Sequence, residues 1–555
     1  MSGFSTPGRS GQGGAKNLAI IHGLHLPFPQ LRSFSKRGPI LSGRERVPRR
    51  WARASICLLV FLTCSAAIRT PAADRIPFKS SSHLSKIDVD LLDDISRRSF
   101  RYFWEQTDPR TGLVLDRART DGKEEDDPAH RNVASIAATG FGLTAYCIAA
   151  DHRWISREVA RERIRTALRF FANGAPGQHG WFYHFMDATT GKRRWKSEVS
   201  SIDTALLLAG VLTARQAFKE DPEIERLATA IYDRVNFIWM TDRDQTVLRH
   251  GWKPETGFLP YWWDTYSEHV ILYLLAIGSP THPIPPVAWN SWRLPLEQFG
   301  GYTYIGGGPL FIQQYSQAWV DLRDYVPEES QEFDAVRPPV NYFANAVAAT
   351  RAQQALGVEL SRRFRGFSAR VWGITASDSA NGYIAWGDLP PDPRIDGTVV
   401  PSAAAGSLMF TPDISIPALR TMLLHYGKTI YGRYGFADAF NPTTGWVSKY
   451  VIGIDAGITL LSAENQRTGM VWRWFLENPE VNWALGLVGL VRNPVGRVGR
   501  DANLGQAQKH RAASQTKRNS ASNSELLPQV RVASSDASAT ANGNPLTSIT
   551  ISGLP

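Results

Sequence analysis

Cysteine is scarce in this chain of 555 residues, which holds three. Cys57 and Cys64 share one short apolar segment, so Cys147 is the cysteine that remains for the rest of the chain. A single thiol excludes an intrachain disulfide and a cysteine-based zinc site there. Apolar residues surround it at 143–149, which indicates a buried helix and an inert core thiol.

Several sequence motifs of catalysis are also missing. The chain has no His-Glu-x-x-His pair for zinc, no phosphate-binding glycine loop and no Gly-x-Ser-x-Gly nucleophile turn. We therefore expect no metal, no nucleotide or other cofactor, and no serine nucleophile.

The net charge of +11 is concentrated at the two ends of the chain. Residues 1–53 hold ten Lys/Arg and one acid, and residues 490–555 hold eight Lys/Arg and three acids. The remainder is slightly acidic. A nucleic-acid-binding protein carries its positive charge on a folded face, so we expect no nucleic-acid partner.

Basic residues precede a short apolar run near the N-terminus. Five arginines lie within residues 44–53, apolar residues fill 56–62, and small residues follow at 65–67. This order is typical of an export signal and predicts a periplasmic or secreted protein. The run is short for a membrane-spanning helix, but inner-membrane anchoring through residues 54–67 is the alternative.

Composition divides the chain into four parts. Residues 1–67 form the basic lead with the export signal or signal anchor, and residues 68–85 form a linker. Residues 86–490 hold the periodic, aromatic-rich part, which we interpret as one catalytic domain. Residues 491–555 are rich in Ser, Ala and Asn and predict a disordered tail.

Two kinds of helix alternate in the central part. Residues 156–173 predict an amphipathic outer helix, whereas 202–218, 266–277 and 454–461 are apolar on all sides and predict helices buried on both faces. The apolar stripe of the outer helix consists of Val159, Ile164, Leu168 and Phe171. This alternation predicts an all-α fold, an (α/α)6 toroid with irregular loops and short strands at its mouth.

Three carboxylates lie where inner helices should begin. Asp203, Glu268 and Asp455 each have Trp, Tyr or Gly nearby. The inner helices of a toroid start at one end, which would gather these side chains in one concave site. Carboxylates supply the acid and the base of glycosidic cleavage, and aromatic faces stack on sugar rings. The sequence therefore predicts a glycoside hydrolase with an oligosaccharide or polysaccharide partner.

Helix capping is the alternative explanation for the same three residues. Ser200-x-x-Asp203 and Thr265-x-x-Glu268 have the spacing of a capping box, and Asp455 could be an N-cap. The sequence alone leaves this alternative open.

The roles of the two main carboxylates follow from their surroundings. Glu268 follows an aromatic segment and Asp264 lies four residues before it, and both features would raise its pKa as a general acid requires. A helix start would keep Asp455 ionised as the base. The residues expected to bind substrate are Asp203, Glu198, Asp264, Trp263, His184, Trp181, Trp195 and Glu464.

Residues 90–485 resemble the bacterial glucoamylase-like domain family, which includes glycoside hydrolase family 144, the endo-β-1,2-glucanases. The resemblance rests on six stretches, at residues 99–104, 135–142, 180–185, 201–206, 275–283 and 464–469. It implies an (α/α)6 toroid and an inverting attack on a β-glucan.

The resemblance also implies roles for particular residues. Glu268 corresponds to the acid and Asp455 to the region of the base, with Asp203 and Glu198 in the site. The family pattern around the base is Ile-Asp-Gln-Gly, whereas this chain has Ala456 after Asp455. That departure leaves one sugar contact, and with it the linkage that is cut, open.

Two other functions remain as alternatives. The first is a catalytically inactive toroid that binds glycans. The second is a polysaccharide lyase, which would need a basic cleft for uronates, and the slightly acidic central part does not favour it.

Overall fold

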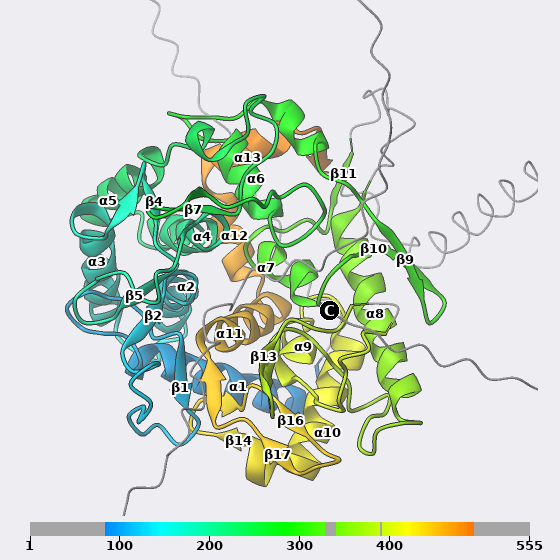
Figure 1. Ribbon diagram of the computed structural model, residues 1–555. Coiled ribbons are helices and arrows are strands. Elements are labelled where there is room, and N and C mark those ends of the chain that lie inside the picture. Colours follow the sequence, from blue (N-terminus) through cyan, green and yellow to red (C-terminus); the bar gives the residue numbers. More distant parts are fainter. Residues whose placement is uncertain (1–83, 328–339, 389–390, 493–555) are drawn as a thin grey trace, which may run out of the picture. The chain divides into compact units, whose positions relative to one another are not determined.

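The computed structural model describes residues 84–327, 340–388 and 391–492 (Figure 1). The chain divides after Asn493 into two units, and every described residue lies in the first. The predicted export signal or anchor at 1–67, nearly all of the linker and nearly all of the tail lie outside the described residues. Within these ranges, none of the helices has the length and apolar character needed to cross a membrane.

The described part of the chain is largely helical. Its α-helices are α1 (Lys86–Glu105), α2 (Ile136–Asp151), α3 (Arg157–Asn173), α4 (Ser201–Ala217), α5 (Pro222–Asp233), α6 (Val270–Ile277), α7 (Phe311–Trp319), α8 (Tyr342–Leu360), α9 (Pro401–Ala405), α10 (Pro412–Ile430), α11 (Gly453–Arg467), α12 (Met470–Leu476) and α13 (Pro479–Leu487). Two short 3₁₀ helices span Ile238–Met240 and Pro286–Asn290.

Short antiparallel strands lie between the helices, as the sequence predicted. The pairs are β1 (Arg117–Arg119) with β18 (Tyr450–Ile452), β2 (Val133–Ser135) with β5 (Phe185–Asp187), β3 (Gly177–Gln178) with β4 (Trp181–Phe182), β9 (Leu296–Phe299) with β10 (Tyr302–Ile305), β11 (Tyr325–Pro327) with β19 (Leu490–Arg492), β12 (Ser377–Ser379) with β13 (Gly382–Ile384), β14 (Tyr431–Gly432) with β15 (Gly435–Phe436), and β16 (Phe440–Asn441) with β17 (Trp446–Val447). One three-stranded sheet joins β6 (Val199–Ser200), β7 (Gly251–Lys253) and β8 (Gly257–Phe258).

The helices form an inner and an outer set. Helices α2, α4, α6, α7, α9 and α11 are buried along almost their whole length. Apolar or small residues surround most of them, and α7 also buries Gln313, Gln314 and Gln317. Successive contacts join α2 to α4, α4 to α6, α6 to α7, α7 to α11, and α11 back to α2 (Figure 1). Helices α1, α3, α5 and α10 lie outside this set and bury a single face.

Glycines bring the inner helices into backbone contact. A Cβ placed on Gly210 of α4 would lie 2.1 Å from the carbonyl oxygen of Gly140 in α2, and one on Gly140 would lie 2.2 Å from that of Leu206. A Cβ on Gly457 of α11 would meet the ring of Phe141 at 2.3 Å. Close packing of α2 with α4 and of α2 with α11 therefore requires glycine at these positions.

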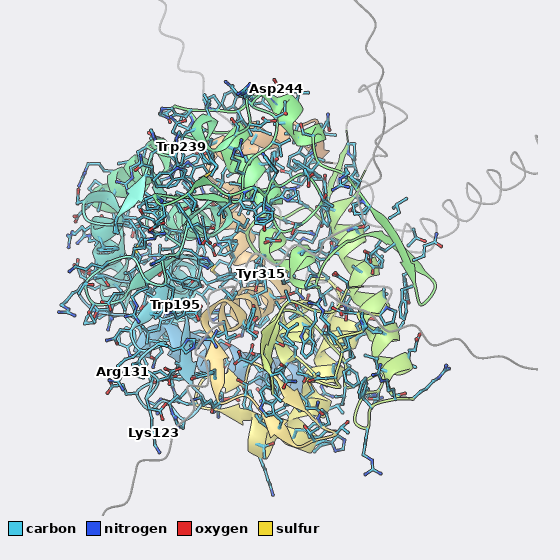
Figure 2. All side chains as sticks on the ribbon, viewed as in Figure 1. Lys123, Arg131, Trp195, Trp239, Asp244 and Tyr315 are labelled. Atoms are coloured by element: carbon cyan, nitrogen blue, oxygen red, sulfur yellow. The ribbon has the colours of Figure 1, made fainter. Side chains whose placement is uncertain are left out.

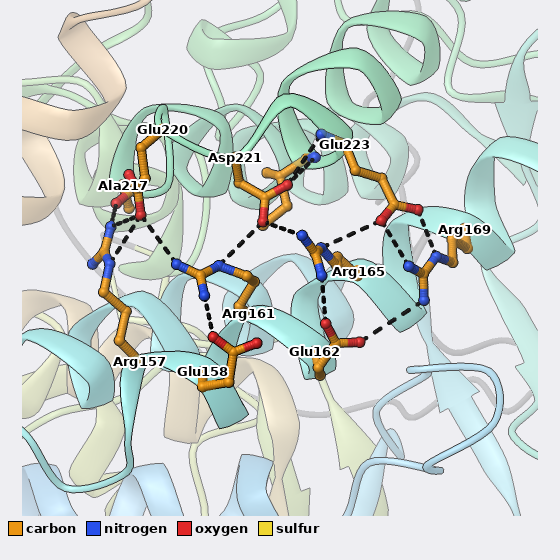
Figure 3. Close-up of polar contacts among 11 residues, drawn as sticks. Arg157, Glu158, Arg161, Glu162, Arg165, Arg169, Ala217, Glu220, Asp221 and Glu223 are labelled. Carbon is orange, nitrogen blue, oxygen red and sulfur yellow. Dashed lines mark hydrogen bonds and ion pairs between the residues drawn. The ribbon is translucent and has the colours of Figure 1, made fainter.

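An ion-pair ladder holds the outer helices α3 and α5 together (Figure 3). Four arginines at positions 157, 161, 165 and 169 follow one face of α3. Arg161 and Arg165 reach Asp221 at 3.1 and 2.7 Å, and Arg169 reaches Glu223 at 2.7 Å. Asp221 is buried and also caps α5 by accepting the N–H groups of its first turn.

Two details of the sequence prediction are wrong. Val159 is exposed, because Ala160 and Ala167 complete the buried face of α3 in its place. Helix α6 begins at Val270 rather than at Tyr266, since residues 266–269 form bends and turns. The thiol of Cys147 is buried in α2, as expected, and donates to the carbonyl of Leu143 at 3.3 Å.

Replacing Gly210 by alanine should lower the free energy of unfolding by ~1–3 kcal/mol, because the new methyl group would press against backbone that cannot move aside. Denaturant unfolding followed by circular dichroism measures the change. Gly486 in α13 is the matched control, since a Cβ there meets nothing within 4 Å. Its alanine variant should be unchanged, or more stable by up to ~1 kcal/mol. Equal losses in both variants would contradict the packing argument.

Candidate active site

Short strands tie the starts of the inner helices together at one end. Strands β2, β6 and β18 lead directly into α2, α4 and α11. A series of pairings connects all three strands. Strand β18 pairs with β1, and a bridge from Leu115 to Ala134 continues to β2. Strand β2 pairs with β5, and a bridge from Tyr183 to Val199 reaches β6. A further bridge, from Arg249 to Trp262, connects β7 to the segment before α6. Side chains at these helix starts are therefore neighbours although they lie far apart in the sequence.

Capping explains one of the three carboxylate positions and not the others. Ser200 caps α4 by accepting the N–H of Asp203 at 3.3 Å, and its hydroxyl donates to the Asp203 carboxylate at 2.5 Å. Glu268 lies two residues before α6, where no side chain caps the helix. Asp455 is the third residue of α11 and not its N-cap. Glu268 and Asp455 are thus free of the capping role that the sequence left open.

His184 joins two of the predicted site residues. Its Nδ1 lies 3.0 Å from Glu198 and its Nε2 lies 3.4 Å from Asp203. Burial alone would lower the pKa of His184, but the charge of Asp203 and the hydrogen bond with Glu198 raise it to about 9. Burial would raise the pKa of Glu198, but its hydrogen bond with the imidazolium lowers it to about 2. The imidazolium therefore bridges the carboxyl groups of Glu198 and Asp203.

Glu268 has the surroundings of a general acid. Burial raises the pKa of Glu268 to about 6, and the charge of Asp203 contributes to the rise. The hydrogen bond that the carboxylate accepts from Ser267 lowers the pKa but does not cancel this effect. Its carbonyl accepts the hydroxyl of Ser316 on α7. The sequence predicted that Asp264 would also raise this pKa, but Asp264 is not among its causes in the structure. It is exposed and pairs with Arg293 at 3.6 Å.

Asp455 lies in a buried group of acids around one arginine. The Arg117 guanidinium contacts Asp116 at 3.1 Å and Asp378 at 3.3 Å, and all three side chains are buried. Asp438 forms a hydrogen bond with Asp455. Burial raises the pKa of Asp455 to about 6, although its interaction with Asp438 opposes this rise.

Tyr315 connects the two main carboxylates. This α7 residue is buried near the centre of the described helices, beside α11 (Figure 2). Burial raises the pKa of its phenol well above the usual value, and the charges of Asp455 and Glu268 raise it further. The phenol of Tyr315 thus lies within electrostatic range of both Glu268 and Asp455, as one shared site would require. A pair of carboxyls that titrate close to neutral pH can donate and accept protons there.

Two predicted substrate contacts lie outside this site. Trp181 is fully buried, donates to the carbonyl of Asn236 at 2.9 Å and packs against Phe237. Glu464 is fully buried in the last turn of α11 and contacts His152 at 2.8 Å. Both side chains are structural here, so the predictions of sugar contact are wrong for them.

Trp263 and Trp195 border the site in different ways. Trp263 is 7% exposed, donates to Ser201 at 2.9 Å and stacks on His250, so its face is not open for a sugar ring. The neighbouring Tyr261 and Trp262 are exposed instead. Trp195 is half-buried and donates to the carbonyl of Ala129 at 2.9 Å (Figure 2), and its contact with substrate stays a prediction.

Sequence reasoning missed several members of the site: Asp116, Arg117, Asp378, Tyr383, Asp438 and Tyr315. Most of them lie in or beside two- and three-residue strands, where no periodic pattern marks them. The one signal was the concentration of Asp and aromatic residues at 378–392 and 434–440. Among the residues that the structure describes, no three His, Cys, Asp or Glu are arranged to hold a metal ion.

Comparisons with known proteins show which proteins this chain is similar to. Residues 260–479 match the family model described as "Glycoamylase: Putative glucoamylase". The crystal structure of an endo-β-1,2-glucanase from Chitinophaga pinensis, in complex with sophorotriose and glucose, is 27% identical with a TM-score of 0.66. It covers 74% of this chain and 99% of that one. Both matches are to glucoamylase-like proteins or β-1,2-glucanases, in line with the resemblance noted in the sequence.

Two matches come from Parabacteroides distasonis. An exo β-1,2-glucooligosaccharide sophorohydrolase (non-reducing end) is 29% identical over 432 residues, which is 71% of this chain. The chain spans only 57% of the length of that curated relative. A β-1,2-glucanase crystal structure is 28% identical with a TM-score of 0.64, and covers 73% of this chain and 60% of that one.

Replacing His184 by glutamine should lower the free energy of unfolding by ~2–4 kcal/mol near pH 6, because two carboxylates would lose their shared cation. The pKa of His184 is raised, so its stabilisation is complete below about pH 6.5 and is lost as the pH rises through about 9. Denaturant unfolding at several pH values measures the difference. The exposed His425 is the control, and its glutamine variant should match the parent throughout. A difference for His184 that did not shrink at high pH would contradict the charge argument.

Proposed function

We propose that this protein is a glycoside hydrolase that cleaves β-1,2-linked glucans with inversion at the anomeric carbon. In this mechanism Glu268 protonates the leaving oxygen, and Asp455 removes a proton from the attacking water. The observation that carries the proposal is the pair of carboxyls, Glu268 and Asp455, at the starts of inner helices that short strands tie together at one end. Burial raises the pKa of each to about 6.

The fold in this proposal is an (α/α)6 toroid, and the chain is exported to the periplasm or secreted. The succession of inner helix contacts supports the toroid, and the basic-apolar order of residues 44–67 supports export. The Chitinophaga and Parabacteroides proteins support β-1,2-glucan as the substrate, since their names give β-1,2-glucan or its oligosaccharides.

The charges around the site favour hydrolysis over the lyase alternative. A lyase that acts on uronates needs free cations to neutralise the substrate carboxylate. Here the Arg117 guanidinium is held by Asp116 and Asp378, and the His184 imidazolium by Glu198 and Asp203. A glycan-binding protein without catalysis would not require two carboxyls whose pKa values are raised by burial, because taking a charge out of water without a partner destabilises the fold.

Release of reducing ends from a panel of defined β-glucans tests the proposal. We expect activity on β-1,2-glucan, and kcat should fall by ~10²–10⁴-fold in Glu268→Gln and in Asp455→Asn. Glu464→Gln is the matched control, because it removes a buried carboxylate at the other end of α11. Proton NMR of the first product should show the α-anomer. Activity retained in Glu268→Gln, an initial β-anomer, or an unsaturated product would overturn the mechanism.

The pH dependence of kcat/KM should be bell-shaped with its maximum near pH 6. Asp455 must be ionised, so activity falls as the pH drops below its pKa of about 6. Glu268 must be protonated, so activity also falls as the pH rises above its pKa of about 6. Initial rates between about pH 4 and 9 measure both limbs. A profile that is flat on the alkaline side would remove Glu268 as the acid.

A further inference from the structure

Asp438 belongs to the buried group of acids around Arg117 and has no role in the mechanism described so far. It lies between β15 and β16 and is 3% exposed. The N–H of Asp378 donates to its Oδ2 at 2.7 Å, which fixes the orientation of the carboxyl. Its main-chain N–H donates to the carbonyl of Tyr450 at 2.9 Å. One hydrogen bond thus orients the side chain, and the other fixes the backbone that carries it.

The remaining oxygen of Asp438 can be satisfied in one way. Oδ1 is buried and accepts no hydrogen bond from any donor among the described residues. Asp438 and Asp455 line one small cavity, where their side chains interact as a hydrogen-bonding pair. Two ionised carboxylates are both acceptors, so this bond requires a proton between them. A proton on Oδ1 of Asp438 gives this oxygen its partner and makes Asp455 the acceptor.

The surrounding charges also require one of the two carboxyls to be neutral. Arg117 is the cation of the group, and Asp116 and Asp378 already hold it. The other titratable groups that face the pair are phenols. They are Tyr383 of β13, Tyr315 of α7, Tyr102 of α1 and Tyr434 before β15. None of these phenols can neutralise a second carboxylate.

Little space for solvent lies beside the pair of Asp438 and Asp455. Asp438 and Asp455 line a cavity of about 20 Å³, closed by Ile95 and Ser99 of α1 together with Tyr434. Such a space has room for about one water molecule. So little water would screen two negative charges poorly, and sharing one proton is the arrangement of lower energy.

We propose that Asp438 is a positioning residue that stays protonated and donates a hydrogen bond to Asp455, which keeps Asp455 ionised and aimed at the attacking water. The proposal rests on the role of Asp455 as the base. During turnover the water O–H bond breaks as its oxygen attacks the anomeric carbon, and its proton passes to Asp455. Asp438 keeps its own proton throughout, and Asp455 later releases the acquired proton to solvent.

The direction of the pKa shifts agrees with this assignment. Burial, then the charges of Asp378 and Asp455, raise the pKa of Asp438 well above the usual range. Burial raises the pKa of Asp455 only to about 6, because the hydrogen bond from Asp438 opposes the effect. At neutral pH the proton therefore resides on Asp438.

Two substitutions test whether Asp438 acts as a neutral hydrogen-bond donor or as a charged group. Asp438→Asn keeps a donor for Asp455 and an acceptor for the Asp378 N–H, so kcat/KM should stay within about fivefold of the parent. Asp438→Ala removes both, so kcat/KM should fall by ~10–100-fold, and the acid limb of the pH profile should move up by about one pH unit. Glu464→Gln is again the control and should leave the acid limb in place.

An infrared difference spectrum tests the proton without relying on activity. At pH 8 the parent minus Asp438→Asn spectrum should contain the C=O band of a protonated carboxyl, and the parent minus Glu464→Gln spectrum should not. If the band is present but no glucan is cleaved, the proposed function fails while the shared proton stands. Three results would overturn the inference. The first is absence of the band, and the second is a loss of kcat/KM in Asp438→Asn as large as in Asp438→Ala. The third is an acid limb that does not move in Asp438→Ala.

Discussion

Backbone contact between the inner helices is the constraint on which the site depends. Glycines at 140 and 210 let α2 and α4 touch along their backbones, and Gly457 admits the ring of Phe141 against α11. Helices packed this closely have their first turns within reach of one another. Short strand pairs then fix these turns at one end, which places Asp203 and Asp455, far apart in the sequence, around one site.

Gathering so many acids has an electrostatic cost, and the site meets it in two ways. Cations hold part of the charge, with His184 between Glu198 and Asp203 and Arg117 between Asp116 and Asp378. The carboxyls left without a cation respond through raised pKa values. The same burial that makes these groups unfavourable when charged thus gives them the proton affinities that acid–base chemistry uses.

Much of the frame of the site could be predicted from the sequence, because long apolar helices have a strong period and their starts are marked. That reasoning placed Asp203 and Asp455 in the first turns of α4 and α11, and the structure agrees. It failed for Glu464, although geometry could have excluded this residue. It lies nine residues after Asp455 on one helix, a rise of roughly 13 Å.

The residues that sequence reasoning missed share a physical reason. Asp378 and Asp438 lie in or beside strands of two or three residues, whose pairing is decided by tertiary contacts and not by local pattern. Aromatic residues posed the reverse problem, because composition does not tell an exposed face from a buried one. Trp181 and Trp263 are packed, whereas Trp262, the residue before Trp263, is exposed.

The ion-pair ladder between α3 and α5 makes one part of the domain respond to ionic strength differently from the rest. Its arginines and most of its acids remain partly in water, so dissolved salt weakens their attraction, whereas the apolar contacts of α2, α4 and α11 are insensitive to it. In concentrated salt, amide hydrogens of α3 and α5 should exchange with solvent while those of the inner helices remain protected. The outer pair would then open as a separate unit before the carboxylate site is disturbed.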